Sequence, residues 1–214
     1  MPQDYAQAVA WFRKAADQGA ANAQANLGYM HEKGQGVPQD YAQAAAWFRK
    51  AADQGEAIAQ ANLGYMHEKG QGVPQDYAQA AAWYRKAADQ GEAIAQSNLG
   101  YLYQKGYGLP QDYAQAVAWF RKAADRGEAI AKANLGVVYE NGQGVPQDYA
   151  QAAAWYRKAA DQGEAIAQVN LARLYEIGKG VPKDLAQARI WYQKAADQGF
   201  DIAKKYLAAL AGQY

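Results

Sequence analysis

Tryptophan recurs at one fixed interval along the chain, and this recurrence constrains the fold more than any other feature of the sequence. Successive tryptophans lie 36 residues apart, and a glycine follows each of them eight residues later. The six tryptophans are Trp11, Trp47, Trp83, Trp119, Trp155 and Trp191. A fixed period of this size is the signature of a repeat array, in which each unit packs mainly against its neighbours. We therefore expect a stack of repeats that shares one continuous core.

The composition excludes several functional classes. Half of the 214 residues are hydrophobic, which is enough to bury a sizeable core. The chain has 22 basic and 21 acidic side chains, and this balance argues against a nucleic-acid-binding surface. It has no cysteine, so disulfides and thiolate chemistry are excluded. No run approaches the roughly 20 apolar residues that span a bilayer, so we expect no membrane insertion.

The first half of each repeat has the pattern of an amphipathic helix. In the first copy, residues 2–19, Asp4 and Gln7 have the spacing of an N-terminal capping box. Trp11 falls on the apolar face, and Gly19 stands where a helix commonly ends with a left-handed residue. We call this helix of each repeat the outer helix.

The second half of each repeat predicts a second helix, which we call the inner helix. In residues 20–33, Leu27 lies on a narrow apolar stripe, beside Gly28 in the helix interior. Glycine costs about 1 kcal/mol there, so we expect close packing of another helix to offset the cost. Residues 34–38 form a glycine-containing loop that ends in proline, which cannot continue a helix.

An aspartate in the last turn of each outer helix is at the wrong end for the helix dipole. In the second copy this residue is Asp53, three positions before Glu56. We expect Asp53 and Glu56 to form a capping box for the following helix. The alternative is a salt bridge between Asp53 and Arg49.

The repeats are close copies of one another. Residues 2–36 and 38–72 differ at only three positions, which indicates recent duplication or deliberate consensus design. We expect a single repeat domain over residues 1–214, with an N-terminal half-repeat, five full repeats and a C-terminal capping helix. These parts are residues 2–19, then 20–55, 56–91, 92–127, 128–163 and 164–199, and finally 200–214. The first helix lacks the polar substitutions of a cap, so we expect a monomer or a weak homodimer through it.

The motifs between the tryptophans resemble the Sel-1-like repeat. The pattern Ala-x-x-x-Leu-Gly-x-x-Tyr-x-x-Gly-x-Gly-Val is present at residues 95–109, with Leu109 in place of the usual valine. It continues from Asp112 through Trp119 to Gly127, and comparable segments cover the whole chain. The resemblance implies an all-α, right-handed superhelix of antiparallel helix pairs, related to tetratricopeptide arrays, with the inner helices along a concave face.

The same resemblance implies a non-enzymatic scaffold or adaptor, without a cofactor, that binds a protein or peptide. Some bacterial members of the family are exported. The first five residues do not form a signal peptide, so we expect a soluble bacterial protein in the cytoplasm, or outside it if a signal peptide was removed. A cysteine-rich subgroup is linked to β-lactam hydrolysis, and this chain lacks its cysteines.

Differences among the copies of the inner helix point to a partner-binding face. Three positions, four residues apart, vary from copy to copy and match the groove positions of tetratricopeptide-type arrays. Beside them runs an asparagine ladder, whose carboxamides suit the backbone of an extended peptide. The candidate binding residues are Asn26, Asn62, Asn98, Asn134 and Asn170, with Tyr29, Tyr65, Tyr101 and Arg173. The structural alternatives are surface drift at the varying positions and hydrogen bonds from the asparagines to neighbouring helix ends.

We expect neither a metal site nor a catalytic site. His31 and His67 occupy the family's buried tyrosine position, and they lack the spacing that places two histidine ligands on one helical face. Ser97 is the only serine, there is no threonine, and the sequence after Ser97 lacks the lysine of the β-lactamase motif. The leading hypothesis is therefore a protein-binding scaffold. The alternatives are an engineered consensus array without a natural ligand and a β-lactamase-like hydrolase.

Overall fold

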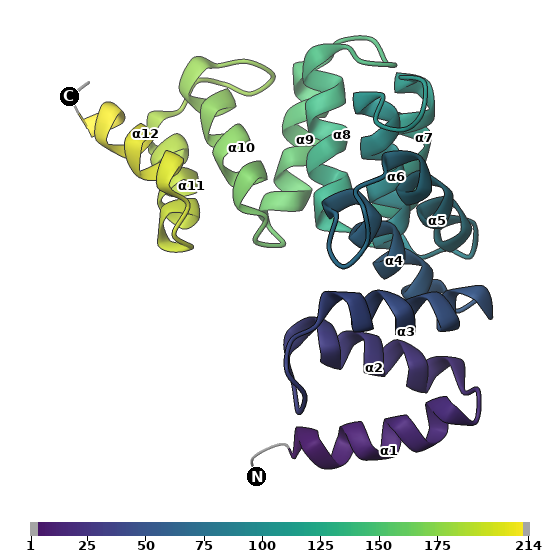
Figure 1. Ribbon diagram of the computed structural model, residues 1–214. Coiled ribbons are helices and arrows are strands. Elements are labelled where there is room, and N and C mark those ends of the chain that lie inside the picture. The colour runs from purple at the N-terminus through teal and green to yellow at the C-terminus, as the bar shows by residue number, and fades with distance from the viewer. Residues whose placement is uncertain (1–3, 212–214) are drawn as a thin grey trace. The chain divides into compact units, whose positions relative to one another are not determined.

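The structure is a computed structural model that describes residues 4–211, and within that range it consists of twelve helices and no strand (Figure 1). Short turns join the helices into antiparallel pairs. The helices are α1 Tyr5–Asp17, α2 Ala21–Lys33, α3 Tyr41–Asp53, α4 Ala57–Lys69, α5 Tyr77–Asp89, α6 Ala93–Lys105, α7 Tyr113–Asp125, α8 Ala129–Asn141, α9 Tyr149–Ala160, α10 Ala165–Ile177, α11 Leu185–Asp197 and α12 Asp201–Ala211. The expected all-α solenoid of helix pairs is confirmed.

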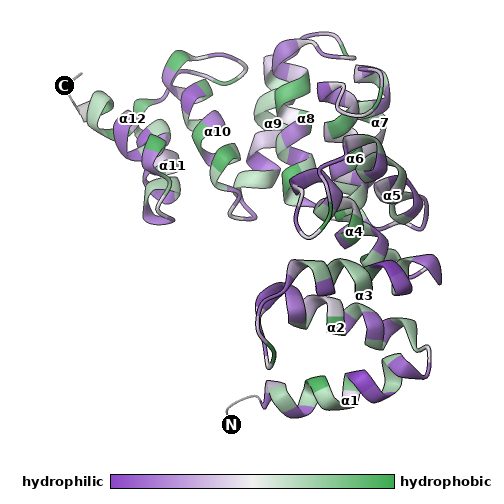
Figure 2. Cartoon of the chain, in the orientation of Figure 1, coloured by the Kyte–Doolittle hydropathy of each residue, from purple (hydrophilic) through white to green (hydrophobic). Residues whose placement is uncertain are grey.

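The helices form two compact units, which divide between Gln111 and Asp112. The first unit contains α1 to α6, and the second contains α7 to α12. In both units the closest packing joins an inner helix to the next outer helix, as between α2 and α3 or between α8 and α9. Every helix carries both hydrophobic and hydrophilic residues (Figure 2). The outer helices α1, α3, α5 and α7 are amphipathic, with an apolar side to bury and a polar side to expose.

An aspartate begins each outer helix, as the capping pattern predicts. Asp40 Oδ1 accepts the Gln43 amide at 2.9 Å, and Asp4 Oδ1 accepts the Gln7 amide at 3.0 Å. This satisfies one of the backbone donors that the first turn of a helix leaves free. The six capping residues are Asp4, Asp40, Asp76, Asp112, Asp148 and Asp184.

The prediction that Asp53 caps the following helix is wrong. The N-cap residue of α4 is Glu56, whose Oε2 accepts the Ala59 amide. The glutamates at the same position cap α6, α8 and α10. Asp53 is still helical as the last residue of α3, whereas Glu56 has the extended backbone that an N-cap residue needs.

Trp47 and Trp83 fill the space between successive repeats of the first unit. Trp47 is 8% exposed and belongs to a core cluster with Val9 and Ala16 of α1 and Leu27 of α2. Trp83 packs in the same way in a cluster that includes Ala45 of α3. Each of these two tryptophans is thus buried by the repeat before it.

The interior glycines permit close approach of the next outer helix, as expected. A Cβ at Gly28 would lie 2.7 Å from the Phe48 ring, and one at Gly64 would lie 2.8 Å from the Tyr84 ring. Contacts that short are repulsive, so a side chain at either glycine would displace a fully buried aromatic ring. In the fifth full repeat, Ala172 stands at this position and is fully buried.

Buried tyrosine hydroxyls are paired with glutamates 16 residues earlier in the chain. The Tyr84 hydroxyl donates to Glu68 Oε2 at 2.9 Å. Burial, and then the charge of Glu68, raise the pKa of Tyr84, so its hydroxyl remains protonated and able to donate. Equivalent bonds join Tyr156 to Glu140 and Tyr192 to Glu176.

Glutamines connect consecutive repeats near the turn between the two helices of a pair. Gln60 is 4% exposed, and its Nε2 donates to the Ala52 carbonyl at 3.1 Å. Its Oε1 accepts a bond of 2.8 Å from Gln90 of the next repeat. The pairs Gln24 with Gln54 and Gln168 with Gln198 repeat this arrangement. These amides therefore satisfy backbone carbonyls and link neighbouring repeats at the same time.

Candidate ligand-binding groove

A groove with a volume of about 440 Å³ lies between α2 and α4. Both helices are inner helices of the first unit, so the groove lies on the predicted binding side. It brings together three of the candidate binding residues: Asn26, Tyr29 and Asn62. Its lining is Asn22, Ala25, Asn26, Tyr29, Glu56, Ile58 and Asn62. We refer to it as the α2–α4 groove.

The asparagine ladder is mostly free of structural hydrogen bonds. Among residues 4–211, the side chains of four of its members make no hydrogen bond to another protein group; these are Asn26, Asn62, Asn134 and Asn170. Asn98 differs, because its side chain hydrogen-bonds to Tyr84. The outer-helix residue that corresponds to Tyr84 in the preceding repeat is Phe48, which has no hydroxyl to offer Asn62. The amides in the α2–α4 groove are therefore available to a ligand.

Three tyrosines stand exposed on the inner helices of the first unit, each beside a lysine. Tyr29, Tyr65 and Tyr101 are 44%, 41% and 37% exposed. The ammonium groups of Lys33, Lys69 and Lys105 lie 5.7, 5.5 and 5.6 Å from the centres of these rings. A nearby cation orients a ring by a cation–π interaction and leaves much of its surface open.

The lysines beside the tyrosines do not all carry a free charge. Lys33 pairs with Glu32 at 2.6 Å, and Lys69 pairs with Glu68 at 2.6 Å. Gln104 stands before Lys105, where the first two repeats have glutamate. The net charge beside the exposed tyrosines is therefore more positive at Tyr101 than at Tyr29 or Tyr65.

The sequence analysis missed an aromatic cluster around Tyr107. The rings of Tyr107 and Tyr77 have centres 4.9 Å apart, and the Tyr101 ring lies edge-on to Tyr107 at 6.3 Å. Tyr107 is 41% exposed. The sequence could have pointed to this cluster, because Tyr107 replaces the glutamine found at this loop position in three of the other copies.

A row of exposed isoleucines was missed as well. Ile58 is 58% exposed and lines the α2–α4 groove. Its equivalents are also exposed, and they are Ile94, Ile130, Ile166 and Ile202. Their period of 36 residues was visible in the sequence, but the first copy has Asn22 at this position. An exposed aliphatic row beside unpaired amides suits a partner with both apolar and polar groups.

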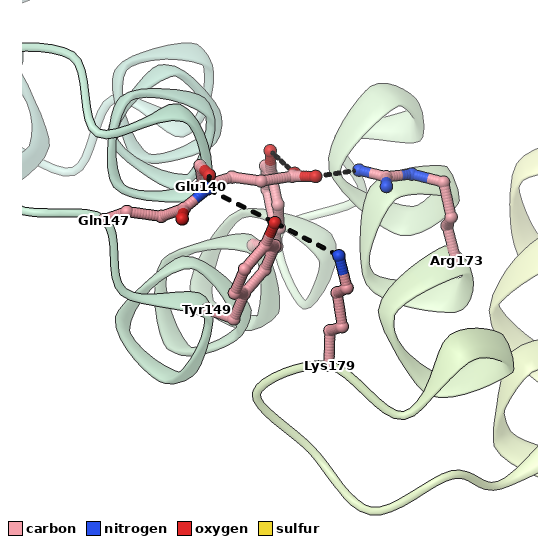
Figure 3. Close-up of polar contacts among 6 residues, drawn as sticks. Glu140, Gln147, Tyr149, Arg173 and Lys179 are labelled. Carbon is pink, nitrogen blue, oxygen red and sulfur yellow. Dashed lines mark hydrogen bonds and ion pairs between the residues drawn. The ribbon is translucent and has the colours of Figure 1, made fainter.

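Arg173, the last candidate, is held in an ion pair (Figure 3). Its Nη2 bonds to Glu140 Oε1, while Glu140 Oε2 accepts the Tyr156 hydroxyl at 2.8 Å. Close by, Lys179 Nζ donates to the Tyr149 hydroxyl at 3.3 Å. Arg173 thus takes part in a network within the second unit, whereas the tyrosines at its position in the first three repeats project into solvent.

The histidines replace tyrosines within the protein, as predicted. Arg49 Nη2 lies 3.3 Å from His67 Nε2, and Arg121 makes the equivalent contact with the Tyr139 hydroxyl at 2.9 Å. His31 and His67 are both buried. Burial, followed by the charge of Arg49, lowers the pKa of His67 below 6.5. For His31 the same two causes act, with Arg13 as the charged neighbour.

The sequence offered few candidates for a catalytic or metal site, and the serine among them is buried. Ser97 is 3% exposed, so the only serine hydroxyl of the chain faces the core. Between residues 4 and 211, no three histidine, aspartate or glutamate side chains gather where they might hold a metal ion. In the same range, no helix has the length and apolar character needed to cross a membrane.

Comparison with known proteins identifies the repeats. A family model described as the Sel1 repeat matches residues 1–19, 21–56, 57–92, 93–128, 129–164 and 165–200. Among proteins of curated function, none matches the chain in sequence.

Solved structures of repeat proteins resemble this chain in sequence and in fold. A Sel1 repeat protein from Oxalobacter formigenes is 36% identical, with a TM-score of 0.87 over 97% of this chain and 88% of that one. The protective antigen c5321 of uropathogenic Escherichia coli, described as having an SLR fold, is 36% identical with a TM-score of 0.70. That match covers 96% of this chain but only 52% of c5321.

A third structure, a sel1 repeat protein from Klebsiella pneumoniae, supports the fold alone, at 23% identity and a TM-score of 0.63. It covers 95% of this chain and 99% of its own. The family model spans nearly the whole chain, and the first two structures share more than a third of its residues. The chain therefore belongs to the Sel1 repeat family.

Proposed function

We propose that the protein is a non-enzymatic scaffold that binds an extended peptide segment of a partner protein along its inner helices. Proteins of the Sel1 repeat family generally serve as scaffolds for protein interactions. The α2–α4 groove is the part of the described surface that best fits a peptide, since it combines unpaired amides with exposed apolar side chains.

The observation that carries the proposal is the pair of free carboxamides on adjacent repeats, Asn26 and Asn62. Each amide can donate and accept together, as the backbone of an extended peptide requires. Ile58 and Tyr29 lie beside them and supply apolar surface for the side chains of the peptide. A ligand that uses both features gains specificity from the amides and affinity from the apolar contacts.

Selection from a random peptide library displayed on phage, followed by fluorescence anisotropy with the selected peptides, tests the proposal. We expect the double substitution Asn26→Ala and Asn62→Ala to weaken binding at least about tenfold, because two hydrogen bonds of about 1 kcal/mol each are lost. The thermal unfolding curve should stay unchanged, since these amides hold no protein group. A matched control is Gln43→Ala, which removes an exposed amide from the outer helix α3.

Two results would count against the proposal. One is a library that yields no peptide with measurable affinity for the folded protein. The other is a set of peptides whose affinity falls as much with Gln43→Ala as with the double asparagine variant.

A further inference from the structure

Tyr107 is held in place by the loop that carries it. Gly106 ends α6 with a φ of +70°, and the amides of Gly106 and Tyr107 both donate to the Leu102 carbonyl. A Cβ at Gly108 would lie 2.2 Å from the backbone of Tyr77, so the loop lies directly on the start of α5. The Tyr107 ring packs on the Tyr77 ring, with centres 4.9 Å apart. The position of the Tyr107 ring is therefore fixed before a ligand arrives, which lowers the entropic cost of binding.

This loop adds a second exposed ring beside the inner-helix tyrosine of α6. The rings of Tyr101 and Tyr107 lie edge to face, with centres 6.3 Å apart, and both side chains are exposed. At the same loop position, the two preceding repeats have Gln35 and Gln71, which supply no ring. The aromatic surface is therefore larger at α6 than at α2 or α4, and aromatic surface of this kind is enriched where proteins bind one another.

Lys105 adds a cation without an acidic partner to this surface. Lys33 and Lys69 each bond to the glutamate before them at 2.6 Å. Gln104 stands where those glutamates stand, and Lys105 makes no ion pair within residues 4–211. The Lys105 ammonium lies 5.6 Å from the centre of the Tyr101 ring. An uncompensated positive charge and an open aromatic surface therefore lie side by side.

The asparagine of α6 is already engaged, unlike those of the two preceding inner helices. Asn98 hydrogen-bonds to Tyr84, whereas Asn26 and Asn62 are free. A peptide that meets free amides on α2 and α4 therefore meets a lysine and aromatic rings on α6. The chemistry that α6 offers to a partner is thus different from that of the α2–α4 groove.

We propose that the partner segment carries an acidic side chain next to an apolar one, and that these two side chains bind at α6. The acidic side chain pairs with Lys105, and the apolar side chain packs on Tyr101 and Tyr107. An aspartate or glutamate supplies the charge that Lys105 lacks in its own repeat. The inference rests on the proposed function, because the segment is the one whose backbone the α2–α4 groove binds.

An acidic side chain suits this place better than the carboxylate at the end of a chain. A chain end is typically captured by several free backbone amides. The amides beside Lys105, those of Gly106 and Tyr107, already donate to Leu102. A single surface lysine can pair with an acidic side chain without such amides. The occupant is therefore an internal acidic residue of the partner.

Peptides selected from a random phage library on the intact protein test the inference. We expect aspartate or glutamate to be enriched at one position, next to an apolar residue. The selected sequences are then synthesised with an amidated C-terminus, so that side chains supply the only carboxylates. Replacement of the enriched acidic residue by its amide should weaken binding about three- to fivefold at low salt, as the loss of a partly exposed ion pair does. Fluorescence anisotropy measures the change.

Variants of the protein assign the charge effect to one lysine. Lys105→Gln should weaken the acidic peptide by the same factor and leave the amide peptide unchanged, because both changes remove one interaction. Gln104→Glu should act in the same direction, since it gives Lys105 the neighbour that Lys69 has. A matched control is Lys86→Gln, which removes an exposed lysine beside Trp83 on the outer helix α5 and should leave every affinity unchanged.

Tyr107→Gln tests the aromatic part of the site separately. It introduces the residue that Gln35 and Gln71 provide in the preceding repeats, so we expect unchanged thermal unfolding. The variant keeps Lys105 but loses the exposed ring. It should therefore weaken the acidic peptide and the amide peptide by equal factors.

The outcomes separate this inference from the proposed function. Peptides that depend on Asn26 and Asn62 but show no preference for an acidic residue overturn the inference and leave the proposed function standing. Acidic peptides that bind the Lys105→Gln variant as tightly as the intact protein also overturn it. Peptides that bind only with a free C-terminal carboxylate overturn the assignment to an acidic side chain. Acidic peptides that depend on Lys105 but on neither asparagine support the acidic contact and overturn the proposed role of the α2–α4 groove.

Discussion

The Tyr84 hydroxyl and the Glu68 carboxylate form a buried hydrogen bond of 2.9 Å between an outer helix and the inner helix before it. Replacement of Tyr84 by Phe keeps the packed ring but removes the donor to a buried carboxylate. We expect the free energy of unfolding to fall by about 1–3 kcal/mol, as is typical when one hydrogen bond to a charged acceptor is lost. Urea unfolding followed by circular dichroism measures the change.

The neighbouring repeat provides the reverse experiment. Phe48 packs on Gly28 as Tyr84 packs on Gly64, and Glu32 is the equivalent of Glu68. Phe48→Tyr therefore brings a hydroxyl toward a carboxylate that has the same place in its repeat. We expect a gain of about 1 kcal/mol in stability. If Tyr84→Phe is neutral and Phe48→Tyr is destabilising, the bond does not contribute as described.

Gly64→Ala separates helix propensity from packing. Propensity alone predicts a gain of about 1 kcal/mol from alanine in a helix interior. The new methyl group would lie 2.8 Å from the buried Tyr84 ring, and overpacking of this kind costs about 1–3 kcal/mol. We expect a net loss of stability in urea unfolding, with a lower midpoint. A variant more stable than the parent would show that the ring moves aside without cost.

His67→Tyr should reduce the sensitivity of the fold to acid. Burial and Arg49 lower the pKa of His67 below 6.5, while the nearby Asp76 carboxylate and the Pro74 backbone act in the opposite direction. The unfolded chain therefore binds a proton more readily than the folded one. The stability from neutral His67 is present above pH 6.5 and is lost as the pH falls through the lowered folded-state pKa.

A tyrosine at position 67 does not titrate in this range, and Arg49 can donate to it as Arg121 donates to Tyr139. Unfolding free energies measured between pH 7 and pH 5, at steps of about half a pH unit, give the slope that checks this prediction. The slope should be smaller in the His67→Tyr variant than in the parent. Equal slopes would mean that His67 binds protons equally well in both states.

Gln60→Met tests the glutamine link between repeats. The substitution removes two hydrogen bonds, because the Ala52 carbonyl keeps only the Gly55 amide as a donor and Gln90 loses one acceptor. We expect a loss of about 1–3 kcal/mol, whereas Gln43→Met on an exposed surface should change stability by less than about 0.5 kcal/mol. Urea unfolding of the two variants is the measurement, and equal effects would contradict a structural role for the link.

Periodicity predicted the fold well, since each repeat restates the same local signals. Asp40 begins a helix, Gly28 permits close packing, and His67 takes the place of a tyrosine, all as expected. The spacing of residues was a less reliable guide to helix caps, because two residues near one helix start can both have the side chain of an N-cap residue. Asp53 and Glu56 both suited a cap, and only backbone geometry shows that Glu56 has that role.

The candidate site was harder to predict, because pairwise contacts decide which polar groups remain free. Asn62 and Asn98 are equivalent in the sequence, yet only Asn98 has a tyrosine hydroxyl beside it. Arg173 shares a position with Tyr29 but pairs with Glu140, 33 residues earlier in the chain. Contacts of this kind depend on residue combinations in adjacent repeats, which the pattern of a single repeat does not contain.

The isoleucine row has a consequence for how a ligand chooses its position on the protein. Ile58, Ile94, Ile130 and Ile166 offer the same side chain at each repeat. Within the first unit, a peptide that recognised only these isoleucines could bind at Ile58 or at Ile94 with equal affinity. Asn22 breaks the equivalence, because it replaces isoleucine in the first copy and lines the α2–α4 groove. Asn22 therefore distinguishes α2 from the other two inner helices of the first unit, so that a bound peptide can be aligned relative to that helix.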